Sequence, residues 1–292
     1  MAERTLFAPL VSAAACAVTN LGPEEFLTHP TKLTNTLRDL QQGLALDIVI
    51  PESGSHLVAE AAGAELTWNT FPPDLNWSMD RIDAFNLEGA GRLPTLLDVI
   101  DRLKYMLRER AAIGLMLDGP QRLSVLSGGK LSLYEAAQIL LNITKQILSK
   151  GGVDILWFRE EGPPPPDGEE WMSVMDPLWG SIRFFQTLPA LHLAGKADGW
   201  LDLIEGTGPI CLPCFDPVQS PLLADRMRHG GNFGIIVPAA RLGTDGDEEG
   251  KETYRSCLAE KGCVLVTNDG DWFGHVPPQA FKKGVERLRD LF

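Results

Sequence analysis

The segment VDILWFRE, Val153–Glu160, decides the fold class of this chain. Apart from Asp154, its first six residues are apolar, and polar residues do not alternate with them. Such a run is typical of a strand in a parallel sheet, where both faces are covered. Arg159 and Glu160 follow only at the end of the run, which places them at the carboxyl edge of the predicted sheet.

Similar runs recur along the chain and alternate with stretches of helical periodicity. The candidate strands are Leu6–Ala17, Ala45–Pro51, Glu65–Asn69, Ala112–Asp118, Val153–Glu160, Ala190–Ala194, Pro209–Phe215, Phe233–Val237 and Cys263–Thr267. The candidate helices are Glu24–Gln42, Leu57–Ala62, Pro94–Arg110, Ser132–Lys150, Glu169–Gln186, Pro221–His229, Glu248–Lys261 and Pro277–Leu291. Strand followed by helix, repeated about eight times, predicts an α/β fold that is either a (β/α)8 barrel or a doubly wound open sheet.

The absence of a glycine-rich phosphate loop favours the barrel. Neither G-x-G-x-x-G nor G-x-x-x-x-G-K-[ST] occurs in the chain. The chain therefore lacks the motifs that are typical of a nucleotide-binding open sheet. A barrel of about 250 residues fits the 292-residue length as well as two domains do. We therefore expect a single (β/α)8 TIM barrel over residues 1–292, with Glu65–Asn69 in an excursion after the second strand.

Composition and charge exclude several classes of partner. The net charge of −13 disfavours nucleic acid and anionic membranes, which bind basic surfaces. The longest apolar stretches are far shorter than the roughly 20 residues of a membrane span. Five cysteines, an odd number in a chain this long, indicate a reducing compartment rather than a disulfide framework. We expect a soluble cytoplasmic protein with a small-molecule substrate, and a homodimer is an open alternative.

Acidic and imidazole side chains follow the predicted strands, at the barrel face where active sites lie. The residues that carry chemistry at these ends are Glu52, His56, Asp118, Glu160, Glu161, His192, Asp216, Asn268, Asp269 and Asp271. Carboxylates and imidazoles together are suited to acid–base catalysis, or to a metal site with oxygen and nitrogen ligands.

An ordered set of segments resembles the uroporphyrinogen decarboxylase superfamily, which also contains the corrinoid-dependent methyltransferases. The similar segments are Asp47–Leu66 (DIVIPESGSHLVAEAAGAEL), Gly91–Lys104 (GRLPTLLDVIDRLK), Leu115–Gly129 (LMLDGPQRLSVLSGG), Asp176–Phe185 (DPLWGSIRFF), Leu191–Gly195 (LHLAG) and Val264–Asp271 (VLVTNDGD). The family fold is the (β/α)8 barrel, so the resemblance implies the same architecture as the strand count. No single motif is diagnostic; the order of the set carries the resemblance.

Departures from the family narrow the expected function. The decarboxylases have an arginine-rich N-terminal segment that this chain lacks after Arg4, and Gly54 stands where they have a catalytic aspartate. The methyltransferase branch binds zinc through H-x-C and a distant cysteine; here His192 is kept but Ala194 replaces the first cysteine. The resemblance therefore implies neither a typical porphyrinogen decarboxylase nor a thiolate zinc site, and we expect no tightly bound structural zinc.

The function that we predict is a decarboxylase-like lyase acting on an organic acid other than a typical porphyrinogen. Predicted catalytic residues are His192, Asp271, Glu52 and His56, with His192 and Asp271 as the acid pair; predicted substrate-binding residues are Glu160, Glu161, Asp216, Trp272 and Asn268. No cofactor is required, but a divalent metal on His192, Glu160 and Asp271 is an open alternative. The alternative functions are corrinoid- or folate-linked methyl transfer, with a corrinoid protein as partner, and a non-catalytic barrel that only binds a ligand.

Overall fold

The computed structural model describes residues 5–54, 56–69, 72–77, 87, 90–207, 210–238, 248–269 and 278–290. Its strands are β1 (Leu6–Phe7), β2 (Ile48–Val49), β3 (Glu65–Thr67), β4 (Asp74–Asn76), β5 (Ala112–Asp118), β6 (Ile155–Glu161), β7 (Leu188–Ala194), β8 (Leu212–Phe215), β9 (Phe233–Val237) and β10 (Cys263–Asn268). Its helices are α1 (Ser12–Thr19), α2 (Pro23–Thr28), α3 (Pro30–Leu44), α4 (Leu57–Ala61), α5 (Leu93–Leu107), α6 (Pro120–Leu126), α7 (Leu133–Ser149), α8 (Gly168–Phe184), α9 (Leu201–Thr207), α10 (Pro221–Arg228), α12 (Glu248–Leu258) and α13 (Pro278–Arg289).

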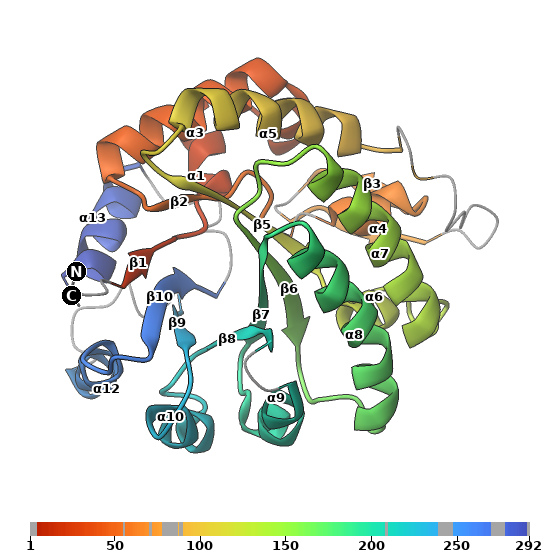
Figure 1. The fold of residues 1–292 in the computed structure, drawn as a ribbon. Helices are drawn as coiled ribbons and strands as arrows, with labels where there is room; N and C mark the ends of the chain where they lie inside the picture. The colour runs from red at the N-terminus through yellow and green to blue at the C-terminus, as the bar shows by residue number, and fades with distance from the viewer. Residues whose placement is uncertain are drawn as a thin grey trace.

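Eight of these strands form one parallel sheet that is nearly closed into a barrel. Their order is β1-β10-β9-β8-β7-β6-β5-β2, and Figure 1 shows the helices arranged around the outside. At the seam between β1 and β2, the Asp47 amide donates to the Phe7 carbonyl at 3.0 Å, and the Asp47 carboxylate accepts from the Phe7 amide at 2.9 Å. The predicted (β/α)8 barrel is therefore confirmed.

Strand side chains that point to the barrel axis form a closed apolar core. The members are Ala8, Leu10, Ile48, Ile50, Met116, Ile155, Trp157, Ala190, Leu212, Cys214, Ile236 and Leu265. This set fills the barrel with packed side chains, as in other TIM barrels, rather than leaving a pore. Trp157 is the largest member and is fully buried. The chemistry of the protein must therefore take place above this core, at one end of the strands.

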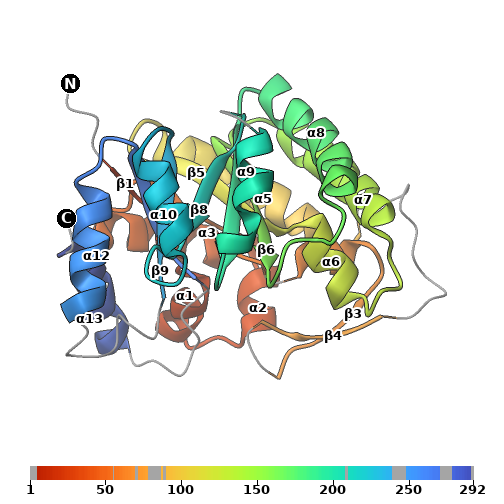
Figure 2. The ribbon, with the colours of Figure 1, turned by 90° about the horizontal axis from the view of Figure 1, so that it is seen from below.

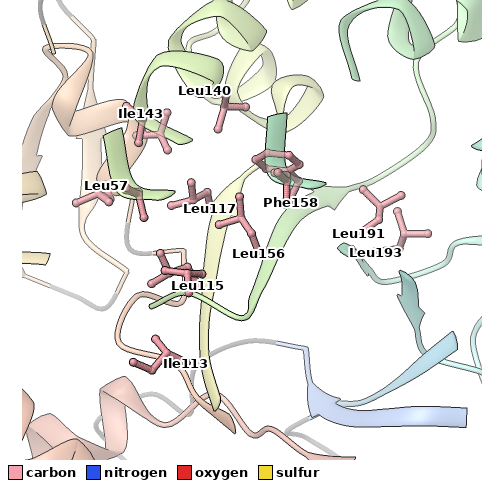
Figure 3. Packing of buried hydrophobic residues seen from close by; sticks show 14 of the residues in the cluster. Leu57, Ile113, Leu115, Leu117, Leu140, Ile143, Leu156, Phe158, Leu191 and Leu193 are labelled. Carbon is pink, nitrogen blue, oxygen red and sulfur yellow. The ribbon is translucent and has the colours of Figure 1, made fainter. Parts of the chain in front are cut away.

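The opposite faces of the strands pack against the helices. Figure 3 shows Leu115, Leu117, Leu156 and Phe158 on this side, close to Leu140 and Ile143 of α7; all are buried in the larger apolar cluster. The continuous apolar sequence of β5 and β6 follows from this burial on both faces.

None of the helices within the described residues is both long enough and apolar enough to cross a lipid bilayer.

The first predicted strand and the first predicted helix differ most from the structure. The predicted strand Leu6–Ala17 is wrong beyond Phe7, because α1 begins at Ser12, where three alanines favour a helix. The predicted helix Glu24–Gln42 is split at His29, because Pro30 opens a new helix and disfavours helical backbone before it.

The segment Glu65–Asn69 is an excursion, as the sequence predicted. Its strand β3 pairs antiparallel with β4 and not with the barrel. Figure 2 shows this hairpin at one end of the molecule, together with α2.

Candidate active site at the carboxyl ends of the strands

The register of β6 decides which strand-end side chains face the barrel axis. Trp157 lies in the interior core, so strand alternation turns Arg159 inward as well and Glu160 outward. Arg159 pairs in register with Asp118 of β5 and with His192 of β7. The three side chains Asp118, Arg159 and His192 therefore belong to one inward-facing ring above the core.

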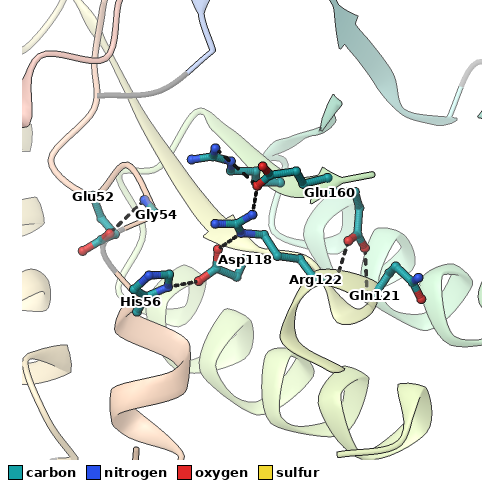
Figure 4. Close-up of polar contacts among 9 residues, drawn as sticks. Glu52, Gly54, His56, Asp118, Gln121, Arg122 and Glu160 are labelled. Carbon is teal, nitrogen blue, oxygen red and sulfur yellow. Dashed lines mark hydrogen bonds and ion pairs between the residues drawn. The ribbon is translucent and has the colours of Figure 1, made fainter. Parts of the chain in front are cut away.

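His56 and Asp118 form a buried pair at this end. His56 precedes α4 and has a φ of 63°, a left-handed backbone that histidine adopts more readily than most side chains. Its Nδ1 lies 3.2 Å from Asp118 Oδ2, and Figure 4 shows the two groups facing each other. Because a carboxylate only accepts, Nδ1 is the donor. Among the described residues Nε2 has no hydrogen-bond partner, so it is the atom that can exchange a proton with a ligand.

Arg122 holds the other oxygen of Asp118. Its Nε donates to Asp118 Oδ1 at 2.7 Å. Burial raises the pKa of Asp118, but the hydrogen bond from His56 and the charge of Arg122 outweigh burial and hold the pKa below its ordinary value. Asp118 is therefore a carboxylate at neutral pH and accepts the hydrogen bond from His56 Nδ1.

Two guanidinium groups converge on Glu161, the last residue of β6. Arg122 Nη1 forms an ion pair with Glu161 Oε2, and Arg159 Nη2 lies 3.6 Å from the same oxygen. The side chains of Arg122 and Arg159 are 13% and 15% exposed, whereas that of Glu161 is 51% exposed. The carboxyl end of the barrel, here called its mouth, thus holds two guanidinium groups with little exposure, and the exposed carboxylate of Glu161 lies against both of them.

Glu160 faces the helix layer and not the barrel axis. Its two oxygens accept from the backbone amides of Gln121 at 3.1 Å and Arg122 at 2.7 Å, which are free donors at the start of α6 (Figure 4). Gly119 gives the carboxyl room, because a Cβ there would lie 2.4 Å from Glu160 Oε1. Burial raises the pKa of Glu160 to about 8 although the two amides lower it. The predicted substrate-binding role of Glu160 stays a prediction, while the contacts of its side chain cap the start of α6.

The pKa of Glu160 makes stability depend on pH. The unfolded chain loses this proton near the ordinary value of 4.5, whereas the folded protein keeps it up to about pH 8. The free energy of unfolding contributed by this group therefore falls as the pH rises from about 4.5 to 8. We expect Glu160→Gln to gain stability relative to the wild type across this window, by at most about 1.4 kcal/mol per pH unit.

Urea unfolding at pH 5, 6, 7 and 8 measures this difference. The exposed Glu109→Gln variant, with the same change in charge, is the control and should show no such trend. A Glu160→Gln difference that does not change between pH 5 and 8 would contradict the prediction.

Glu52 supports the loop that carries His56. One oxygen accepts from the Gly54 amide at 3.0 Å, and the other lies 3.5 Å from Arg92 Nη1. Arg92 also donates to Glu60 Oε2 at 2.8 Å. The structure thus places Glu52, predicted to be catalytic, in a buried ion pair beneath the loop.

The side chain of His192 reaches from β7 to the end of β10. Its Nε2 lies 3.1 Å from the Asn268 carbonyl, so Nε2 is the donor and the ring is in one tautomer. Burial, with the nearby charge of Arg159, lowers the pKa of His192 to about 3. A lowered pKa favours the neutral form of His192 at pH 7, and its predicted role as an acid stays a prediction.

Asn268 and Asp216 make contacts that hold neighbouring segments. Asn268 Oδ1 accepts from the Leu10 amide at 2.6 Å, which ties β10 to the segment after β1. Asp216 accepts from the Val218 amide at 3.0 Å and from the Tyr254 hydroxyl at 2.9 Å. The predicted role of both residues in substrate binding stays a prediction, but the contacts of their side chains are structural.

The predicted metal ligands are not brought together within the described residues. Glu160 faces the helices while His192 faces the barrel axis, and the described chain contains no group of three or more acidic, histidine or cysteine side chains placed to hold a metal. Asp271 and Trp272 lie outside the described residues. Glu160 and His192 therefore do not fit one ion.

The sequence placed Asp118 at a strand end but gave it no role, and it did not single out Arg159 or Arg122 as site residues. The uninterrupted apolar run before Arg159 conceals the alternation that shows which of Arg159, Glu160 and Glu161 faces inward. The spacing of four residues between Asp118 and Arg122 across a strand-to-helix turn is the signal that could have indicated the pair.

Comparisons with known proteins support the fold. No protein-family model matches the sequence, and no curated protein is similar to it at a significant level. Among solved structures, a methyltransferase from Methanosarcina mazei superposes with a TM-score of 0.72 at 15% identity, over 99% of this chain and 94% of that one. SacUVDE (TM-score 0.46, 12% identity, 99% of each chain) and a D-psicose 3-epimerase crystallised with D-fructose (TM-score 0.43, 10% identity, 98% and 96%) are more distant. At 15% identity, the similarity to the methyltransferase shows a shared fold alone.

Proposed function

We propose that the protein is a decarboxylase-like lyase that binds an organic acid at the carboxyl ends of the strands. The observation that carries the proposal is the buried His56–Asp118 pair, 3.2 Å apart, beside the guanidinium groups of Arg122 and Arg159. An imidazole held by a carboxylate is a general acid, and guanidinium groups with little exposure bind carboxylates strongly. The ordered resemblance to the uroporphyrinogen decarboxylase superfamily adds support.

In this proposal the anchored carboxylate is one that the product keeps. An ion pair to the leaving carboxylate would stabilise the substrate more than the transition state and so slow the reaction. The substrate is therefore an acid with at least two carboxyl groups, of which one lies on Arg122 and Arg159. The bond to the other carboxyl group breaks, CO2 leaves, and the electron pair stays on the carbon. His56 Nε2 then delivers a proton to that carbon and is reprotonated from solvent.

A screen of organic acids tests the proposal. Thermal shift with mono-, di- and tricarboxylic acids identifies ligands, and NMR follows CO2 release and the new C–H bond in each ligand. We expect stabilisation by acids with two or more carboxylates and turnover of at least one of them. Binding without turnover would instead support the non-catalytic barrel, and no binding of any acid would contradict the proposal.

Methyl transfer is the second candidate, because the structurally similar protein from Methanosarcina mazei is a methyltransferase. It would require a one-carbon carrier such as a corrinoid protein or a folate. Metal analysis of the purified protein and a pull-down with a corrinoid protein separate the two candidates. A stoichiometric metal together with a corrinoid partner would favour methyl transfer over decarboxylation.

A further inference from the structure

Glu161 lies where a ligand carboxylate would lie. Its Oε2 contacts the guanidinium groups of both Arg122 and Arg159, which come from α6 and β6. One carboxylate oxygen shared by two guanidinium groups is the arrangement in which proteins hold an anionic ligand. Here the chain itself supplies the anion.

The three charges differ in how firmly they are held. Arg122 is anchored by Asp118, and both arginine side chains are at most 15% exposed. Glu161 is 51% exposed and is followed by Gly162, which has a φ of 85° and open space on the side where a Cβ would lie. The guanidinium groups are therefore fixed, while a rotation about the side-chain bonds of Glu161 would move its carboxylate into solvent.

We propose that Glu161 occupies the carboxylate subsite of the empty protein and is displaced when a substrate carboxylate binds. This inference rests on the proposed function, since it assigns the same two arginines to the substrate. Glu161 is then an internal competitor: it neutralises the cationic mouth in the absence of substrate and lowers the apparent affinity for every carboxylate ligand by the fraction of time that it occupies the subsite. Acids with a second anchoring group overcome this competition better than monocarboxylates do.

Binding of succinate at pH 7 and low ionic strength, measured by isothermal titration calorimetry, tests the inference. We expect Glu161→Gln to bind succinate about twofold to fivefold more tightly than the wild type, which is the ratio of dissociation constants that corresponds to the loss of a partly exposed ion pair. Glu109→Gln, which removes the same charge from an exposed position, controls for net charge and should bind like the wild type.

Glu161→Asp separates occupancy of the subsite from general repulsion. Aspartate keeps the charge at the mouth but is shorter by one methylene, and the contact with Arg159 is already 3.6 Å long. If Glu161 competes by position, Glu161→Asp also binds succinate more tightly than the wild type. If Glu161→Asp binds like the wild type, or Glu161→Gln no more tightly than Glu109→Gln, the competitor role is wrong.

Arg159→Met tests the proposed function independently. Loss of succinate binding in Arg159→Met, with unchanged affinity in Glu161→Gln, would overturn the competitor role and leave the carboxylate subsite in place. Unchanged binding in Arg159→Met, or no binding to any variant, would overturn the subsite and the proposed function together. Urea unfolding confirms that each variant is folded before it is titrated.

Discussion

A His56→Asn variant should turn over the acid identified in the screen about 10²–10⁴ times more slowly than the wild type, with little change in KM. Asparagine suits this test because it tolerates the left-handed backbone, with a φ of 63°, that His56 adopts. Its amide N–H2 can also take the place of Nδ1 and donate to Asp118. The variant therefore keeps the loop and the pair with Asp118 but has no group at the position of Nε2. The loss in kcat measures the proton transfer alone.

His229→Asn is the matched control, because His229 is exposed and its Nδ1 contacts only the Asp225 carbonyl of the same helical turn among the described residues. This variant should keep the wild-type kcat. If His56→Asn also kept it while binding the acid normally, His56 would not be the proton donor. A rise in KM without a fall in kcat would instead indicate that His56 binds substrate uniformly in ground and transition states.

Trp157→Ala should lower the free energy of unfolding by about 3–5 kcal/mol, the largest effect on stability that we expect from one substitution in the barrel core. Trp157 is fully buried at the barrel axis, and its ring lies where a Cβ on Gly114 would be, 2.4 Å from Cζ3. The closed sheet around it cannot collapse onto the space that the ring leaves. Urea unfolding followed by far-ultraviolet circular dichroism measures the change.

Gly114→Val provides a double-mutant test of this packing. Alone it should destabilise by about 1–3 kcal/mol, because valine overlaps the indole ring. Combined with Trp157→Ala it fills part of the cavity, so the double variant should be less destabilised than the sum of the two single variants. An additive result would show that the two positions do not share the space described.

The fold could be predicted because its strands are long apolar runs of the kind that a parallel barrel requires. β5 and β9 have the bounds that the sequence predicted. The first strand could not be delimited in this way, since Leu6–Ala17 is apolar apart from Ser12 and a buried helix such as α1 has the same appearance as a buried strand.

The candidate site was predicted only in part, and for a related reason. Strand ends rich in acids and imidazoles pointed to the carboxyl ends of the strands, where the structure places His56 beside Asp118. The inward direction of Arg159 depends on alternation, which β6 does not display because both of its faces are apolar. Asp118 and Arg159 are adjacent only because β5 and β6 pair in register, a long-range fact that no local pattern contains.

The uneven pairing around the barrel divides the site into parts of different local stability. β6 is paired with β5 over Gly114–Asp118 and with β7 over Leu188–Ala194, whereas β2 is paired with β5 at Ile48 and Val49 and the segment after it adds one bridge, from Ser53 to Met116. The free energy of local opening should therefore be smaller near β2 than in β6, so backbone amides near β2 should exchange with deuterium faster. His56 follows the less extensively paired strand and Arg159 lies within the more extensively paired one, so we expect the segment that carries His56 to open more readily than β6.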